Sequence, residues 1–223
     1  MSSPVIDGLV VGDDAWASVV PATGFRQVQP NDGQPSSQKT EVFVGYSDTS
    51  LYIGVIAHDD DPEGIIVTDS RRDSSLDDTD AFLVIIDGLL DRQNGFMFGT
   101  NAAGIEYDAQ VTKEGTGGGF GSGGGAFNLN WDGSWTVRSN IGEYGWSAEF
   151  EIPFRTLRYG SGAVQDWGIN FQRNIRRNNE IAYWAPLDRN RNLQRVSEAG
   201  TLKSVEPPAQ RNLQLTPYVL SSA

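Results

Sequence analysis

The sequence predicts an all-β protein, an antiparallel β-sandwich of jelly-roll type with about ten strands and few helices. Short runs rich in β-branched and aromatic residues recur along its 223 residues, and turn residues separate them. Little of the chain shows helical periodicity. The 26 glycines and 10 prolines suit a protein with many turns.

The first two strands are expected over residues 40–46 and 51–58, with a tight hairpin over residues 47–50 between them. The first run alternates in polarity, as in a strand with one buried face. The second run is mostly apolar on both faces, as in an interior strand. Ahead of them, Trp16 is expected to pack against the sandwich as the N-terminal segment wraps around it.

The stretch at residues 76–108 is expected to organise the fold. It contains three runs typical of successive antiparallel strands, over residues 81–86, 95–101 and 105–111. The first run is apolar on both faces, which predicts a strand buried inside the sandwich. An acidic loop precedes this block, so the loops beside it are the first candidates for a ligand site.

The last part of the chain returns to the β pattern, with strands expected over residues 135–141, 146–152 and 167–172. Pro153 ends the second of these, because proline cannot donate to a ladder. Residues 154–159 are expected to make a short helical turn, and residues 173–184 a polar hairpin. The glycine-rich residues 115–125 predict a mobile loop, since they lack the GK[ST] end or following helix of a phosphate-binding loop.

The charge and the missing cysteines narrow the functional classes. Asp+Glu total 29 against 17 Lys+Arg, a formal net charge of -12. That charge argues against a nucleic-acid partner, which needs a basic surface. It suits a soluble extracytoplasmic protein, or carboxylates that hold divalent cations. Without cysteine, disulfides and thiolate metal sites are excluded. No apolar run is long enough to span a membrane, so we expect no direct membrane insertion of this segment.

A series of motifs runs through the chain in a recognisable order. An IDG and a tryptophan stand near the start, followed by TEVFVGYSDTSLYIGVIAHDDDP and SRRDSSLDDTDAFLVIID, then GFMFGTNAAG, GWSAEFEIPFRTLRY and WGINFQRNIRRNNEIAYW, and finally SEAGTL. This series resembles the N-terminal domain of a family of bacterial outer-membrane proteins of unknown function. That domain is similar to the family 9 carbohydrate-binding modules.

The resemblance implies a β-sandwich that binds carbohydrate and often holds structural calcium. It implies a module over residues 1–208 and the start of a truncated C-terminal membrane barrel over residues 209–223. The implied location is extracytoplasmic, in the periplasm or at the cell surface of a Gram-negative bacterium, associated with the outer membrane. The implied partners are a glycan and the protein's own C-terminal barrel.

Two positions depart from the better-studied sugar-binding modules, which hold the sugar between two tryptophans. The place of the first falls near Asp77, inside LDD, and has no aromatic residue. The place of the second falls in residues 188–192, which read DRNRN. The scaffold is therefore expected to be kept while the tryptophan clamp is absent.

Acidic residues gather on the loops ahead of the central block. Calcium takes six to eight oxygen ligands, mostly carboxylates and carbonyls, so the candidate metal ligands are Asp59, Asp60, Asp61, Asp69, Asp73, Asp77, Asp78 and Asp80. Their spacing matches no EF-hand. The alternative is a solvated loop whose acids form ion pairs with Arg71 and Arg72.

A polar cleft is the candidate sugar site, because sugar sites combine aromatic faces with planar polar groups at the hydroxyls. The candidate ligand-binding residues are Arg71, Arg72, Asn101, Trp131, Arg173, Arg176 and Trp184. Trp131, beside the glycine-rich loop, is the best exposed candidate among the tryptophans. In contrast, Trp135, Trp146 and Trp167 fall in strand alternation and are expected in the core.

Two further chemistries need weighing. Some relatives of this sandwich bind haem through methionine and histidine, and this chain offers His58 and Met97, although a methionine between phenylalanines is more often core. Glycosidases need two carboxylates across a cleft. Glu149 and Glu151 share one strand face, but an exposed polar face explains them equally well. No motif around any serine supports Ser-His-Asp chemistry, so we expect no enzyme.

The resulting prediction is a non-catalytic carbohydrate-binding-like module of a cell-envelope protein that binds a glycan. The alternative is a structural or interaction domain that docks on its own membrane barrel or on a protein partner, with no sugar ligand. A more remote alternative is a haem-binding relative of the same sandwich.

Overall fold

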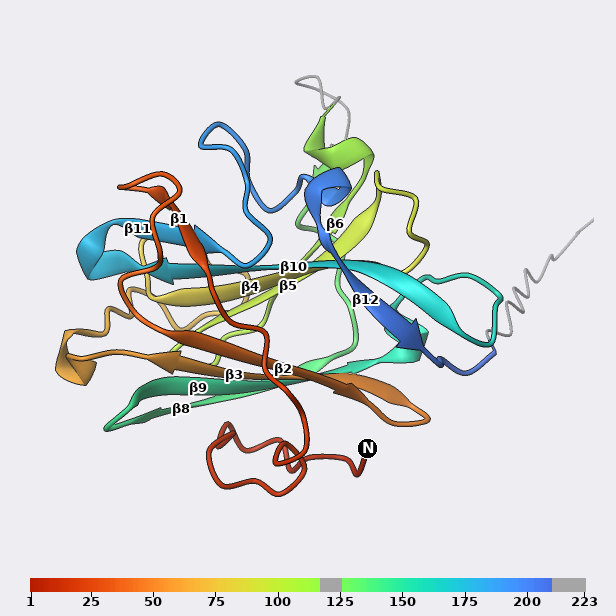
Figure 1. The fold of residues 1–223 in the computed structure, drawn as a ribbon, viewed down its shortest axis with the longest axis horizontal. Helices are drawn as coiled ribbons and strands as arrows, with labels where there is room; N and C mark the ends of the chain where they lie inside the picture. The colour runs from red at the N-terminus through yellow and green to blue at the C-terminus, as the bar shows by residue number, and fades with distance from the viewer. Residues whose placement is uncertain (117–125, 210–223) are drawn as a thin grey trace, which may run out of the picture.

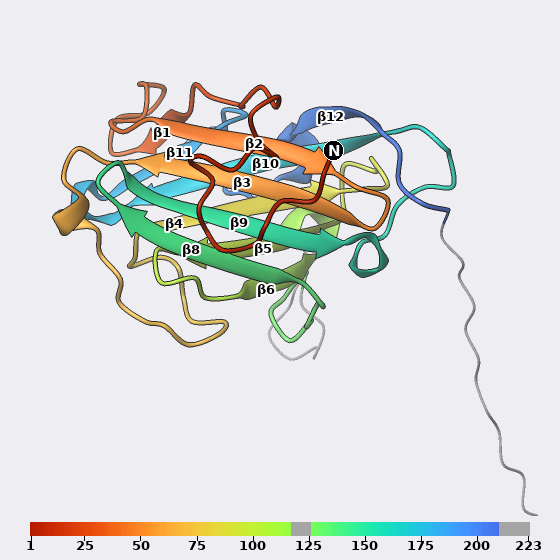
Figure 2. The same cartoon turned by 90° about the horizontal axis from the view of Figure 1, so that it is seen from below.

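Two antiparallel β-sheets pack face to face in the computed structural model, which describes residues 1–116 and 126–209 (Figure 1, Figure 2). The predicted all-β sandwich is confirmed. Most of the glycine-rich stretch at residues 115–125 lies outside the described residues, as do all but the first of residues 209–223. Among the described residues, no helix is both long and apolar enough to cross a membrane.

The larger sheet has eight strands and is centred on the pair β10 and β4. Its strands run in the order β1 (Arg26–Gln29), β11 (Glu180–Tyr183), β10 (Gln165–Ile175), β4 (Ala81–Asp87), β5 (Gly95–Asn101), β6 (Tyr107–Val111) and β7 (Phe127–Asn128). The eighth, β12 (Gly200–Val205), pairs with the first half of β10, whereas β11 pairs with its second half. The 11-residue β10 is therefore long enough to pair with both β12 and β11 along one edge, while β4 pairs along the other.

The smaller sheet has four strands, in the order β2 (Thr40–Tyr46), β3 (Ser50–His58), β9 (Gly145–Pro153) and β8 (Thr136–Gly142). The predicted hairpin at residues 47–50 is confirmed, with Tyr46 opposite Leu51. Asp59 follows β3 directly and Asp80 precedes β4 directly, so the connection between the sheets begins and ends on an aspartate at one end of the sandwich.

Within residues 1–116 and 126–209, helical structure is limited to single turns, as expected. The predicted turn after Pro153 is the 3-10 helix η3 (Phe154–Thr156). The others are η1 (Pro62–Gly64), η2 (Lys113–Gly115), η4 (Arg176–Asn178) and η5 (Val196–Glu198). In the hairpin between β10 and β11, η4 ends at Asn179, whose φ of 48° is left-handed, a conformation that asparagine tolerates.

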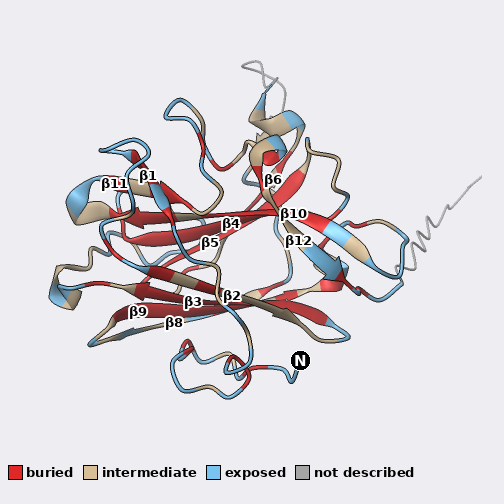
Figure 3. Ribbon diagram, in the orientation of Figure 1, coloured by how far each residue is buried: buried red, intermediate tan, exposed pale blue. Residues whose placement is uncertain are grey.

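The core between the sheets is aromatic. Trp135, Trp146 and Trp167 are all buried there, as predicted. Trp135, just before β8, stacks on Phe150 of the neighbouring β9 with ring centroids 5.7 Å apart. Figure 3 shows buried residues along the strands of both sheets.

The outer faces of both sheets are covered too. On the larger sheet, Leu83 and Met97 pack against Leu187 and Leu193 from the connection between β11 and β12. On the smaller sheet, the N-terminal strap (residues 1–21) lies across the strands (Figure 1), as predicted for Trp16. Covering on both sides explains why β3 and β4 are apolar on both faces.

Trp16 sits on bare backbone of β3. A Cβ at Gly54 would lie 2.9 Å from a ring carbon of Trp16, so glycine leaves the space that the indole fills. The indole Nε1 donates to Glu149 of the neighbouring β9 at 2.8 Å. The strap is thus fixed by both packing and a buried hydrogen bond.

Candidate ligand-binding site

A buried arginine lies at the end of the sandwich where β3 ends and β4 begins. Arg173 of β10 is fully buried, and its guanidinium carbon lies 5.3 Å from the ring centroid of Trp146. Its three side-chain nitrogens have no hydrogen-bond partner among the described residues. Burial lowers the pKa of Arg173 to about 10, an effect that the carboxylates of Asp80, Asp59 and Glu180 oppose. This cation is therefore surrounded by acids but bonded to none of them.

Two aspartates share the site, and each has one oxygen without a described partner. Asp59 accepts the Asp61 backbone N–H at 2.8 Å through Oδ1, while its Oδ2 is unpaired. Asp80 accepts the Ile66 N–H at 2.8 Å through Oδ2, while its Oδ1 is unpaired. Burial raises the pKa of Asp80. Leaving such atoms unpaired costs about 1 to 3 kcal/mol each, so the site is built at a cost in stability.

Two more unpaired polar atoms belong to residues of the adjacent strands. Thr40 and Trp146 both lie opposite Ala57, on either side of β3, and Thr40 Oγ1 and Trp146 Nε1 are buried without a described partner. We call Thr40, Asp59, Asp80, Trp146 and Arg173 the inner cluster. It combines unpaired donors with unpaired acceptors, which fits a ligand that offers both.

The segment at residues 60–66 closes this end of the sandwich. Thr79 Oγ1 donates to the Ile66 carbonyl at 2.8 Å, and Arg177 in η4 donates to Asp59 Oδ1 and, at 3.1 Å, to the Asp61 carbonyl. These bonds tie η1 to η4, the two coiled turns at the same end of the molecule in Figure 1. With this segment in place, all five residues of the inner cluster are buried.

An open polar pocket of about 100 Å³ lies beside the closure, on the β10–β11 hairpin. It is lined by Gln29, Asp77, Asn174, Arg176, Asn179, Glu180 and Ile181. Amide, carboxylate and guanidinium groups dominate this lining, and all of them are planar hydrogen-bonding groups. Glu180 connects the two parts, because it lines the pocket and its charge acts on Arg173. We call the inner cluster and this pocket together the polar end of the molecule.

The predicted calcium ligands are not grouped. Among the described residues, no three His, Cys, Asp or Glu side chains are placed to hold one metal ion, whereas calcium needs six to eight oxygens. Four of the acids instead form ion pairs: Asp59 with Arg177, Asp69 with Arg71, Asp73 with Arg72, and Asp78 with Arg176. The arrangement therefore does not fit a calcium ion at any of the predicted ligands, which are Asp59, Asp60, Asp61, Asp69, Asp73, Asp77, Asp78 and Asp80.

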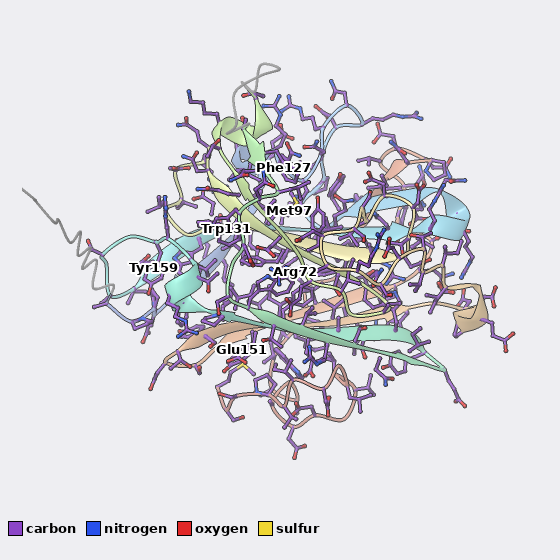
Figure 4. All side chains as sticks on the ribbon, turned by 180° about the vertical axis from the view of Figure 1, so that it is seen from behind. Arg72, Met97, Phe127, Trp131, Glu151 and Tyr159 are labelled. Carbon is purple, nitrogen blue, oxygen red and sulfur yellow. The ribbon has the colours of Figure 1, made fainter. Side chains whose placement is uncertain are left out.

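Arg71 and Arg72, predicted for a sugar cleft, are bound by carboxylates. The exposed Arg71 contacts the half-buried Asp69 at 2.6 Å. Arg72 contacts Asp108 at 2.7 Å, Asp132 at 2.6 Å and also Glu106, and Figure 4 shows it near the middle of the molecule, away from the polar end. Only Arg173 and Arg176 of the predicted set lie at the polar end.

Asn101, Trp131 and Trp184, also predicted for the sugar site, all lie outside the polar end. Asn101 is buried and donates to the Asp69 carbonyl at 2.8 Å, so it is structural. Trp131 is half-buried, because it packs on Phe96 with centroids 4.7 Å apart (Figure 4). Trp184 directly follows β11, is also half-buried, and lies against Phe171 at 5.5 Å in an apolar groove of about 180 Å³.

The haem candidates lie in different sheets. His58 ends β3 and its Nε2 is 2.7 Å from Glu41, while Met97 of β5 is buried on the outer face of the larger sheet. The polar face predicted for Glu149 is also wrong, because the strap covers it. Glu149 is fully buried and accepts three N–H groups, from Trp16 at 2.8 Å, Gly8 at 3.0 Å and Asp7 at 3.1 Å.

Comparison with known proteins identifies the fold. No family model matches the chain, and no curated protein matches it. A family 9 carbohydrate-binding module from Caldicellulosiruptor kristjanssonii in complex with cellotriose aligns over 98% of this chain and 96% of its own, with a TM-score of 0.60 and 16% identity. A structure of such a module from that organism with glucose covers 97% and 96%, with a TM-score of 0.60 and 17% identity.

A third structure is a putative carbohydrate-binding protein from Bacteroides uniformis, with a TM-score of 0.62, 12% identity and coverage of 84% of this chain and 87% of its own. At these identities the likeness shows the fold and nothing finer. The fold is that of the carbohydrate-binding modules, as the order of motifs predicts. The C-terminal barrel stays a prediction.

Proposed function

We propose that this chain is a non-catalytic module that binds a neutral glycan at the polar end. The observation that supports this is the unpaired mixture of donors and acceptors in the inner cluster. Arg173 and Trp146 offer N–H groups, and Asp59 and Asp80 offer carboxylate oxygens. A hydroxyl both donates and accepts, so a sugar satisfies both kinds, whereas Arg173 repels a cation and the aspartates repel an anion.

The outer pocket supplies the first contact in this proposal. Its planar side chains bind sugar hydroxyls in the way that Asn, Gln, Asp and Arg groups orient polar ligands. The sugar then displaces Arg177 from Asp59 and reaches the inner cluster. The likeness to modules solved with cellotriose and glucose supports a neutral sugar as the ligand class.

A glycan array, probed with and without calcium, tests the proposal, followed by calorimetry on any sugar that binds. The informative variant is Asp80→Asn. Its amide oxygen keeps the bond from the Ile66 N–H, while the unpaired acceptor becomes a donor. We expect at least tenfold weaker binding, about 1.4 kcal/mol, against no change for Asp69→Asn, a half-buried control outside the polar end. Equal binding by both variants would disprove the site, and an array without binders would disprove the function.

The second candidate is a structural or interaction domain with no sugar ligand, docked on its own barrel or on a protein partner. One observation favours it: none of the six tryptophans is exposed. The tryptophan clamp of the sugar-binding modules therefore has no counterpart here. A negative array combined with co-purification of the full-length protein's C-terminal region supports this candidate. The extracytoplasmic, outer-membrane location is part of both proposals, and cell fractionation tests it.

A further inference from the structure

A second cleft opens at the opposite end of the sandwich and is larger, at about 580 Å³. It lies where the β2–β3 hairpin, the end of β9 and residues 208–209 meet. Ser50 begins β3 in this cleft, and His58 ends β3 beside Asp59, so the 9-residue strand separates the two sites by roughly 27 Å. Figure 4 shows Tyr159, on the wall of the cleft, at the end of the molecule away from η1.

Three charged side chains of this cleft keep free hydrogen-bonding groups. Asp48 and Arg155 form no ion pair or side-chain hydrogen bond within the described residues, although both line the same cleft. Glu151 accepts Ser50 Oγ at 3.0 Å through Oε1, while its Oε2 has no described partner. Arg72, in contrast, is bound by four carboxylates.

The backbone of the cleft is already occupied. The Phe154 N–H donates to the Thr49 carbonyl at 2.9 Å, and Tyr159 Oη donates to the Pro208 carbonyl at 3.0 Å. The cleft is built from strand ends and turns, so it presents no free strand edge of the kind that binds an extended peptide. Recognition here falls to side chains: a guanidinium, two carboxylates and the hydroxyls beside them.

We propose that this cleft is a second carbohydrate site, which binds a short neutral oligosaccharide. Arg155 donates to hydroxyl oxygens while Asp48 and Glu151 Oε2 accept hydroxyl protons, so each group finds its complement on one ligand. The volume lies within the range of ligand clefts, about 300 to 1,000 Å³. Pro153 and Phe154 supply apolar wall for the C–H faces of the sugar rings. The chain then carries two sites facing opposite ways.

The test is a titration of the ¹⁵N-labelled chain with neutral trisaccharides, followed by NMR: cellotriose, xylotriose, maltotriose, mannotriose and chitotriose. At least one is expected to shift the amides of Glu151 and Arg155. Arg155→Ala and Glu151→Gln should each weaken that binding at least tenfold. Arg158→Ala is the matched control, because Arg158 is also exposed and has no partner among the described residues, but lines a different cavity. It should bind as the unmodified chain does.

The polar end is read out separately in the same titration. Asp80→Asn should leave the shifts at Glu151 and Arg155 unchanged, so a failure of the proposed function and a failure of the second site give different results. The second site is overturned if no trisaccharide shifts the cleft amides, or if Arg158→Ala weakens binding as much as Arg155→Ala. It is also overturned if a zwitterionic tripeptide displaces the sugar, since that result assigns the cleft to peptides.

Discussion

Replacing Glu149 with alanine should detach the N-terminal strap from the smaller sheet. The carboxylate accepts three N–H groups from the strap: the indole of Trp16 and the backbone of Gly8 and Asp7. Each donor left without an acceptor costs about 1 to 3 kcal/mol. Asp7 is half-exposed and can bond water instead, so two donors carry the loss.

The burial of the carboxylate offsets part of this loss. Burial raises the pKa of Glu149, which shows that the ionised group is desolvated at a cost. When the desolvation of the carboxylate is subtracted from the loss at the two unpaired donors, Glu149→Ala should lower the free energy of unfolding by about 3 kcal/mol. For a domain of this size, that corresponds to a fall in melting temperature of roughly 6 to 12 °C.

Urea denaturation followed by tryptophan fluorescence measures the effect. Glu151→Ala is the matched control, since Glu151 lies two residues on, on the same strand face, and holds a single hydroxyl. It should lose less than about 1 kcal/mol. Trp16→Phe keeps most of the ring packing but removes Nε1, so it should cost about 1 to 2 kcal/mol alone and almost nothing in Glu149→Ala. Additive losses, or equal losses for the two glutamates, would refute the role of Glu149.

Three further predictions concern pH, calcium and backbone strain. Because burial raises the folded pKa of Glu149 above its unfolded value, its contribution is full below the unfolded pKa and is lost as pH rises through the folded pKa. The stability of the unmodified chain relative to Glu149→Gln should therefore fall as pH rises above about 4.5, the ordinary pKa of glutamate, and a constant difference would contradict this. Chelation should leave the melting temperature unchanged, because the described acids form no metal group; a fall on adding EDTA would show a site that they do not form. Gly145→Ala should lower the free energy of unfolding by more than about 2 kcal/mol, since φ is +119° and a Cβ would lie 2.3 Å from the Ala57 carbonyl oxygen. Gly12 also has a left-handed φ but open space around it, so Gly12→Ala should lower it by only about 1 kcal/mol. Equal melting temperatures for the two variants would refute the difference.

The local pattern of apolar and polar residues predicts most of the strands. β3 and β4 show apolar residues on both faces, and this pattern correctly predicts strands covered on both sides. The sequence did not predict β1 and β7, which are 4 and 2 residues long. An edge strand of this length is defined by pairing with its neighbour rather than by its own sequence. The same holds for β12, which exists through its pairing with β10.

The site was harder to predict, because its residues meet through tertiary contacts. One signal was present: Arg173 stands in phase with Phe171 and Ile175, so alternation alone places it on the core face of β10. Thr40 stands in phase with Val42 of β2 in the same way, whereas Arg177 carries no such signal. Glu149 alternates with apolar residues and so indicates a solvent face, and nothing local reveals that a strap over 130 residues away covers it.

The strap is synthesised first, but the residue that holds it in place is synthesised much later. Gly8 and its acceptor Glu149 are 141 residues apart in the chain, and a ribosome adds about 5 to 20 residues per second. The strap is therefore made roughly 7 to 30 s before its acceptor. A nascent chain that ends before β9 lacks Glu149, so the strap cannot yet form the three hydrogen bonds that fix it to the sheet.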